Sequence, residues 1–368
     1  MSVMKLIYDT TLNSPDLFYA SKFNAPDPII FFEFRTKKYL VLNDLEYDRA
    51  LNESRVDKVL RLNDFINKNG KNSIENIINK IIKKMNPSEI LVPYNFPSYI
   101  FQKIPKRIKK VVFDSNVFYK KRLIKTELEI SNIKSVMRDT EKVMKEIVNI
   151  IKYSKVRNNN LIHNGKTLTS EFLINYCQRE LLKYSLVCPD CIIASGADSS
   201  QPHNHGSGPI KHSTPIVIDI FPKSLVTGYY GDITRTFCKG SPSKELNNMY
   251  RAVLKGQKIG LKFLRSGVNG KSIHSKIEEE FNRLEFPTSY INNRASGFIH
   301  STGHGLGLEI HEPPRISKNS EILKNNNVVT VEPGLYYPKI GGIRIEDTVV
   351  VKKTGIQNLT KFPKFFKL

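Results

Sequence analysis

Residues 300–314 read HSTGHGLGLEIHEPP, and this stretch decides how the rest of the chain is interpreted. Its three glycines, Gly303, Gly305 and Gly307, surround and follow His304. Because glycine lacks a Cβ, another backbone segment can approach such a stretch closely. The pattern predicts that His304 lies in a crowded interior position, where a packed core would ordinarily hold an apolar side chain.

Acidic residues occupy similar positions elsewhere in the chain. Asp219 lies inside PIVIDIF, and Asp232 opens DITRTF thirteen residues later. Glu332 lies in VVTVEPG and Glu346 in GGIRIEDTVVV, again among β-branched residues typical of strands. Carboxylates that converge on one point repel each other unless a cation or a shared proton neutralises them.

Each of these residues alone has an ordinary structural explanation. Asp219 can hydrogen-bond a turn, His304 can be a satisfied interior histidine, and Glu346 can pair with Arg344. Taken together, four carboxylates and one imidazole balance two divalent metal ions. Oxygen-rich ligands with one histidine favour Mn²⁺, and they also suit Fe²⁺, Co²⁺ or Zn²⁺. Two such ions can share a water molecule, lower its pKa and direct it at a polarised carbonyl.

The motifs GHGLGLEIHEPP, EPG and GIRIED, in this order after the two aspartates, resemble the metallopeptidase family of methionine aminopeptidase, aminopeptidase P and prolidase. The resemblance covers roughly residues 120–368 and implies the pita-bread catalytic fold. In residues 42–54, LNDLEYDRALNES is similar to the N-terminal domain of creatinase and prolidase. This additional domain disfavours methionine aminopeptidase and favours the aminopeptidase P, prolidase and creatinase branch.

The resemblance implies a role for each metal-ligating residue. Asp219 is expected to bind one ion through both carboxylate oxygens. Asp232 and Glu346 are expected to bridge the two ions, and His304 and Glu332 to complete the second site. Glu332 is also expected to handle the proton of the attacking water.

The same resemblance implies roles for residues around the metals. His311 resembles the histidine that stabilises the tetrahedral intermediate. His203 in QPHNHG corresponds to the histidine that contacts the scissile amide, with His205 as an alternative. His300 has the position associated with the prolyl pocket, and Arg344 resembles an arginine that buttresses the site; we expect both to serve substrate binding.

Three further features bear on the site. The segment between Asp219 and Asp232 is two residues longer than the commonest family spacing, in a connection where insertions are tolerated. Thr234 and Arg235 are expected either to orient Asp232 or to make ordinary strand contacts. Cys188 and Cys191 form a lone C-x-x-C, and because Cys177 and Cys238 do not form a second pair, the sequence does not favour a zinc or redox site.

Hydrophobic periodicity predicts two domains. Residues 1–122 are expected to form an α/β creatinase/prolidase-like N-terminal domain, and residues 123–368 an α+β pita-bread domain with a largely antiparallel sheet. Expected strands are 28–34, 38–42, 90–93, 111–114, 216–221, 232–237, 328–331 and 342–351. Two expected helices begin near residues 45 and 169, and three more span 130–151, 243–264 and 272–284.

Composition excludes several protein classes. The chain has 368 residues, 40% of them hydrophobic, which excludes a collagen, a coiled coil or wholesale disorder. No apolar run approaches the ~18 residues of a membrane helix, and no secretory leader is evident, so we expect a soluble, cytoplasmic protein without membrane contacts.

The net charge of +22 is the feature that favours another kind of partner. Its densest run, Lys103–Lys125, can be read as a solvated surface or as a nucleic-acid patch. The run matches no nucleic-acid-binding motif and has few aromatic residues, which favours the solvated surface.

The leading hypothesis is an Xaa-Pro aminopeptidase that acts on small proline-containing peptides as a homodimer. Prolidase, an Xaa-Pro dipeptidase, is the nearest alternative, and no residue outside the shared motif can be assigned to binding a prolyl carboxylate. Creatinase-type hydrolysis can dispense with metal, and the intact ligand set argues against it. A catalytically inactive relative that binds protein or nucleic acid is the alternative of another class; such relatives typically lose metal ligands.

Overall fold

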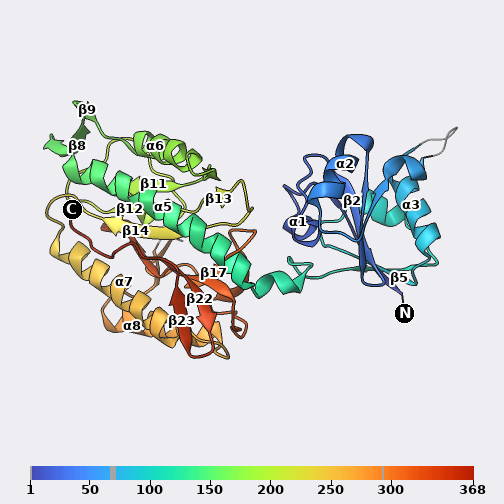
Figure 1. Ribbon diagram of the computed structural model, residues 1–368. Coiled ribbons are helices and arrows are strands. Elements are labelled where there is room, and N and C mark those ends of the chain that lie inside the picture. Colours follow the sequence, from blue (N-terminus) through green and yellow to red (C-terminus); the bar gives the residue numbers. More distant parts are fainter. Residues whose placement is uncertain (1, 67–71, 292–293) are drawn as a thin grey trace. The chain divides into compact units, whose positions relative to one another are not determined.

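The structure is a computed structural model that describes residues 2–66, 72–291 and 294–368 (Figure 1). The chain divides into two compact units, Met1–Arg122 and Leu123–Leu368. Each unit has its own sheets and its own hydrophobic core, as the α/β and α+β predictions required. The two units are therefore described one after the other.

The first unit is built on a six-stranded mixed sheet with the strand order β4-β3-β2-β1-β5-β6. The strands are β1 (Val3–Asp9), β2 (Ile29–Phe34), β3 (Lys37–Leu42), β4 (Lys58–Arg61), β5 (Glu89–Val92) and β6 (Lys109–Val112). Strands β1, β2 and β3 are antiparallel neighbours, and the outer pairs are parallel. The predicted strands at 28–34, 38–42 and 90–93 are confirmed, 111–114 is shifted, and β1 was missed.

Helices cover this sheet with their apolar faces. They are α1 (Pro15–Ser21), α2 (Asp44–Glu53), α3 (Ile74–Met85) and α4 (Ser98–Lys103), with short 3₁₀ turns η1 (Leu62–Phe65) and η2 (Lys120–Leu123). In α3, isoleucines 77, 78, 81 and 82 are buried at the i, i+1, i+4 and i+5 spacing of one helix face. They pack against Met4, Leu6 and Ile90 of the sheet.

The basic run Lys103–Lys125 is solvated along most of its length but not at its end. Lys103, Lys106, Arg107 and Lys109 are exposed, as the solvated-surface interpretation predicts. Arg122, by contrast, is buried in an ion pair with Asp16 at 3.1 Å. Because a buried charge needs a partner, the end of the run has a structural role that the composition did not reveal.

The second unit consists of antiparallel sheets with helices packed on them. A three-stranded sheet has the order β11 (Ile192–Ser195), β12 (Ile216–Ile220), β14 (Ile233–Phe237), and a five-stranded sheet has the order β18 (Glu312–Ile316), β17 (Gly303–Gly305), β19 (Val328–Val331), β22 (Asp347–Lys352), β23 (Gly355–Asn358). Shorter pairs are β20 (Gly334–Tyr337) with β21 (Gly341–Arg344), β10 (Leu186–Val187) with β13 (Lys223–Ser224), and β15 (Ser289–Ile291) with β16 (Arg294–Ser296). Strands β7 (Lys155–Arg157), β8 (Asn160–His163) and β9 (Lys166–Thr167) form another small sheet.

Four helices complete this unit: α5 (Glu127–Tyr153), α6 (Ser170–Leu182), α7 (Lys244–Phe263) and α8 (Gly270–Arg283), with the 3₁₀ turn η3 (Asp198–Ser200). Each follows the predicted periodicity. Thr126 caps α5 in a reciprocal capping box with Glu129. Helices α7 and α8 bury apolar faces in one core with strands β19, β21 and β22.

One predicted strand is divided in two. The expected strand 342–351 separates into β21, which pairs with β20, and β22, which pairs with β19. Glu346 lies at the break, and its backbone N–H donates to the Thr234 carbonyl oxygen at 3.1 Å. Because the Glu346 N–H bonds to strand β14, Glu346 is not part of the continuous strand that its β-branched neighbours predicted.

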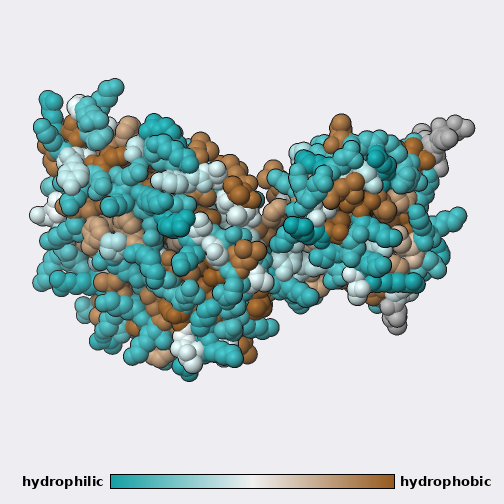
Figure 2. Space-filling model, viewed as in Figure 1, coloured by the Kyte–Doolittle hydropathy of each residue, from teal (hydrophilic) through white to brown (hydrophobic). Residues whose placement is uncertain are grey.

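Within the described residues, no helix is both long enough and apolar enough to span a membrane. The faces visible in Figure 2 are mostly hydrophilic, with scattered apolar side chains.

A buried ion pair fixes the start of α5 to the histidine-rich segment. The Lys125 ammonium lies 2.8 Å from a carboxylate oxygen of Glu312, and both side chains are at most 2% exposed. Glu312 also accepts backbone N–H groups of Leu308 and Glu309. A Cβ on Gly307 would lie 2.7 Å from this carboxylate, so glycine is needed there.

We predict that Lys125→Met lowers the free energy of unfolding by about 3–5 kcal/mol, because it leaves the Glu312 carboxylate buried without this cation. The shift of the urea midpoint measures the effect. Lys142→Met is the matched control, since its pair with Asp139 is 2.7 Å long but the lysine side chain is 49% exposed. Exposed pairs contribute at most about 1 kcal/mol, so similar losses in the two variants would contradict the prediction.

Candidate metal centre

The five predicted ligands come from different strands of the second unit. Asp219 lies in β12, and Asp232 immediately precedes β14. His304 is the middle residue of β17, Glu332 follows β19, and Glu346 separates β21 from β22. Because these strands belong to two sheets that face one cavity, residues far apart in sequence meet there.

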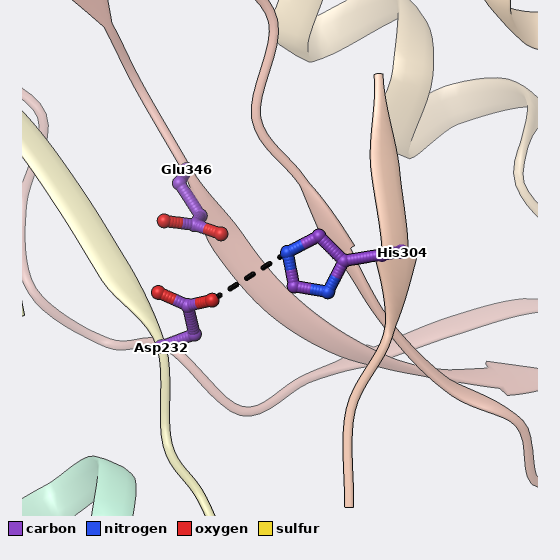
Figure 3. A group of neighbouring side chains, drawn as sticks. All are labelled: Asp232, His304 and Glu346. Carbon is purple, nitrogen blue, oxygen red and sulfur yellow. Dashed lines mark ion pairs between the residues drawn. The ribbon is translucent and has the colours of Figure 1, made fainter. Parts of the chain in front are cut away.

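Three of the five side chains form a tight cluster. One ligand atom each of Asp232, His304 and Glu346 lies within 4.8 Å of the others (Figure 3). The His304 Nε2 atom is 3.7 Å from Asp232 Oδ2 and 3.1 Å from Glu332 Oε1. Asp219 lines the same cavity. The structure thus places all five predicted ligands around one cavity.

Backbone contacts orient His304 for coordination. Its Nδ1 atom lies 3.1 Å from the Gly305 carbonyl oxygen, which can only accept a hydrogen bond, so Nδ1 carries the proton. The lone pair of Nε2 is then directed at the carboxylates. This is the arrangement in which a second contact fixes the tautomer of a metal-ligating imidazole.

Two carboxylates are anchored through one oxygen and leave the other available. Arg344 binds Asp219 Oδ2 at 2.6 Å, and Thr234 donates to Glu346 Oε2 at 2.7 Å. The remaining atoms, Asp219 Oδ1 and Glu346 Oε1, are buried and have no hydrogen-bond partner among the described residues. Because buried oxygen atoms are rarely left unsatisfied, this donor set fits divalent metal ions.

The electrostatics of the cluster support the same conclusion. Burial, reinforced by the charge of Glu346, holds the pKa of Asp232 well above its usual range. Burial and the charge of Glu332 do the same for the pKa of Glu346. Carboxylates placed this close need compensating positive charge to ionise together, and divalent ions provide it.

Arg344 is the principal positive charge of the described residues around the site, and its guanidinium is fully engaged. Besides Asp219, it donates to Thr234 Oγ1 at 3.1 Å, to the Tyr336 hydroxyl at 2.7 Å and to the Pro202 carbonyl at 3.2 Å. Through Thr234 it also supports Glu346. A single buried side chain therefore positions ligands from both sides of the cluster.

The predicted histidines line the same cavity, which has a volume of about 860 Å³. The rings of His304 and His311 are perpendicular, with centroids 4.4 Å apart. Burial lowers the pKa of His311 and of His300 to about 4, so both are neutral near pH 7. His203 and His205 also line the cavity.

His300 is held by contacts at both nitrogens. Its Nδ1 lies 2.8 Å from the Ser301 carbonyl oxygen, and its Nε2 lies 3.0 Å from the Tyr336 hydroxyl. Nδ1 therefore donates and Nε2 accepts. The ring of Phe298 packs against His300 with centroids 5.7 Å apart, so this part of the cavity offers ring surfaces.

Several cavity residues were not identified from the sequence. Arg315 and Lys318 add positive charge to the lining, and His274 is buried and also lines the cavity. Tyr336 links Arg344 to His300. Arg315 directly follows HSTGHGLGLEIHEPP in the sequence, and this position next to the motif could have identified it as a residue of the site.

The fold and the buried cluster of carboxylates and histidine define a metal-dependent hydrolase. Residues 131–353 match the model of metallopeptidase family M24, and the chain belongs to this family. The predicted resemblance, the pita-bread fold and the hydrolase class are thereby confirmed. Membership of the family implies divalent metal ions.

Relatives with known names agree with this assignment. The chain is 34% identical over 331 residues to the Xaa-Pro dipeptidase of Pyrococcus horikoshii, which covers 88% of this chain and 83% of that protein. Among solved structures, prolidase from Pyrococcus furiosus matches this chain with a TM-score of 0.79 and 27% sequence identity. X-Pro aminopeptidase from Thermotoga maritima matches it with a TM-score of 0.81 and 28% sequence identity. Each of the two alignments covers 99% of this chain and 97% of the solved structure.

We predict that Asp232→Ala greatly reduces the content of divalent metal, because this residue belongs to the tight cluster with His304 and Glu346. Metal analysis of the purified protein by mass spectrometry measures the change. His311→Ala is the matched control: it should keep the metal and lose turnover by on the order of 10²-fold, the usual cost of removing a transition-state donor. Unchanged metal in Asp232→Ala, or near-normal turnover in His311→Ala, would contradict the assignment.

Proposed function

We propose that this protein is an Xaa-Pro dipeptidase, which hydrolyses the bond before proline in dipeptides. The observation that carries the proposal is the composition of the cavity wall, where Arg315 lines the same cavity as the carboxylate cluster. A guanidinium is suited to a carboxylate, and a dipeptide presents its free prolyl carboxylate close to the bond that is cleaved. The name of the Pyrococcus horikoshii relative supports this choice.

Five residues form the proposed binding site for two divalent ions, Mn²⁺ being favoured by the oxygen-rich donors: Asp219, Asp232, His304, Glu332 and Glu346. When bound, such ions polarise a carbonyl and increase the acidity of water. The chain supplies the remaining functions. We propose that Glu332, which accepts a hydrogen bond from Thr330 at 3.0 Å, takes up the proton of the attacking water.

The histidines are proposed to act on the substrate. The neutral ring of His311 lies beside His304 and would donate to the oxygen on which negative charge develops. His203 is preferred over His205 for the contact with the scissile amide. His205 Nδ1 lies 3.4 Å from the Cys191 carbonyl oxygen, so the protein already engages the ring of His205.

Proline selectivity is proposed to depend on shape and on the absent N–H. A prolyl nitrogen cannot donate a hydrogen bond, and its ring bends the chain. His300, with both nitrogens engaged, would offer its ring to the pyrrolidine together with Phe298. Arg344, placed among the substrate-binding residues by the resemblance, makes so many contacts with the protein that we propose a positioning role for it instead.

The second candidate is the Xaa-Pro aminopeptidase that the sequence favoured. The structural similarity to the Thermotoga maritima X-Pro aminopeptidase supports it. An aminopeptidase leaves room beyond proline, whereas a dipeptidase needs the prolyl carboxylate.

We predict that Xaa-Pro dipeptides are cleaved faster than Xaa-Pro-Xaa tripeptides, and that Xaa-Ala dipeptides are poor substrates. Arg315→Gln should raise KM for the dipeptide by about tenfold or more with little change in kcat, because a hydrogen bond to a charged group contributes about 1.5–3 kcal/mol. Steady-state kinetics on the three substrates measure these effects.

The matched control is Lys353→Gln, which removes an exposed positive charge that is not part of the cavity lining. It should leave KM unchanged. Efficient cleavage of the tripeptide together with a normal KM in Arg315→Gln would favour the aminopeptidase. Equal cleavage of Xaa-Pro and Xaa-Ala would reject proline selectivity.

We propose in addition that the protein is a homodimer, an expectation that rests on the resemblance to aminopeptidase P and prolidase. Light scattering at micromolar concentration should give twice the chain mass of 42.2 kDa. A monomer mass would reject this proposal and leave the proposed activity untouched.

A further inference from the structure

Three buried thiols meet next to the wall of the catalytic cavity. Cys177 belongs to α6, and Cys188 and Cys191 flank the turn between β10 and β11. The Cys191 thiol interacts with the thiols of both Cys177 and Cys188. In the sequence the C-x-x-C has no second cysteine pair, but the fold brings Cys177 close to it.

The turn holds Cys188 and Cys191 in a geometry that suits a disulfide. Pro189 and Asp190 are its exposed central residues. A four-residue turn brings its first and last Cα atoms within about 7 Å, and a disulfide usually spans about 4.4–6.8 Å. The two buried thiols are close enough to interact with each other.

The turn is directly connected to the catalytic centre. Asp190 and Ile192, on either side of Cys191, line the cavity. In the neighbouring strands β11 and β12, visible in Figure 1, Ile192 is the register partner of Asp219. The Cys188 thiol also interacts with the backbone of Phe221, two residues beyond Asp219. A change of covalent structure at this turn therefore acts on the strand that carries a proposed metal ligand.

We propose that Cys188 and Cys191 are an oxidation site, at which a hydroperoxide forms a disulfide that lowers peptidase activity reversibly. The arrangement of the thiols supports Cys191 as the reactive one. Hydrogen bonds from Cys177 and Cys188 lower the pKa of the Cys191 thiol to about 4, and thiolates are the form of cysteine that reacts.

The chemistry balances with the hydroperoxide as the oxidant. The Cys191 thiolate attacks the terminal oxygen, the O–O bond breaks, and the alkoxide or hydroxide released takes up a proton, which leaves a sulfenic acid. The Cys188 sulfur then attacks the Cys191 sulfur, and the sulfenic oxygen leaves as water. The two sulfur atoms lose two electrons, and the peroxide bond gains them.

A metal site made of the three thiols is the competing explanation. Three thiolates that share one zinc ion would have their sulfur atoms close together. In residues 2–66, 72–291 and 294–368, the group whose ligand atoms all lie within 4.8 Å is Asp232, His304 and Glu346, and the three cysteines do not form a second one. The geometry thus favours pairwise bonding of sulfur atoms.

The proposal is tested on the full-length, metal-loaded protein treated with hydrogen peroxide. Alkylation in denaturant followed by mass spectrometry should show that the number of free thiols falls from four to two, with a disulfide in the peptide that contains Cys188 and Cys191. Most of the activity should be lost and should return with dithiothreitol.

Variants separate this effect from other oxidative damage. Cys191→Ala should keep its basal activity and become resistant to peroxide, and Cys188→Ala gives a second test if the first variant is poorly folded. Cys238→Ala is the matched control. Cys238 is buried in the core that α7 and α8 form with strands β19, β21 and β22, and burial raises the pKa of its thiol to about 11. This control should remain as sensitive as the wild type.

Three results would overturn the proposal. The first is four free thiols after treatment, and the second is an equal loss of activity in Cys191→Ala. The third is zinc that co-purifies with the wild type and is lost in Cys191→Ala, which would establish a metal site. The number of thiols does not depend on which peptide is cleaved, so this test can fail independently of the proposed function.

Discussion

The second unit depends on one electrostatic constraint, which is that several carboxylates must be buried close together without unfolding the chain. Burial of an unpaired carboxylate is costly, and neighbouring carboxylates increase the cost. Arg344 offsets part of it, through its 2.6 Å contact with Asp219 and its hydrogen bond to Thr234. The other oxygens of the cluster remain for divalent cations, which makes the site a consequence of charge balance.

The same constraint explains the surrounding hydrogen bonds. Asp219, Glu346 and His304 each have a contact that fixes their orientation and an atom that is left for chemistry. The Gly305 carbonyl orients His304, Thr330 orients Glu332, and Tyr336 orients His300. These partners lie on the strands that carry the functional residues or on adjacent ones, so the sheets themselves preorganise the site.

Much of this arrangement could be predicted because strands that carry ligands have an unusual composition. A charged residue among β-branched neighbours, as at Asp219 or Glu346, is conspicuous in a sequence. Arg315 and Tyr336 were missed because an arginine or a tyrosine in a strand has common surface and packing roles. Their importance depends on the distance to residues far away in sequence, which periodicity does not encode.

The fold was predictable to a similar degree. Long amphipathic helices such as α5 and α7 were identified, because burial of one face imposes a strong 3.6-residue period. Strand β1 was missed although it pairs with both β2 and β5, since Lys5 and Asp9 interrupt its apolar residues. The contact of Cys177 with the C-x-x-C is of the same kind, a tertiary neighbour that spacing alone cannot reveal.

The break at Glu346 has a mechanical consequence. Asp219 lies in the three-stranded sheet, and Asp232 immediately precedes strand β14 of that sheet. His304 lies in the five-stranded sheet, Glu332 immediately follows its strand β19, and Glu346 lies between the β20–β21 hairpin and β22. Ligation of a shared cation would join these sheets at a point where the backbone ladder is interrupted. A cation bound in this way would act as a staple across the interior, and its binding free energy would become part of the resistance of the domain to unfolding.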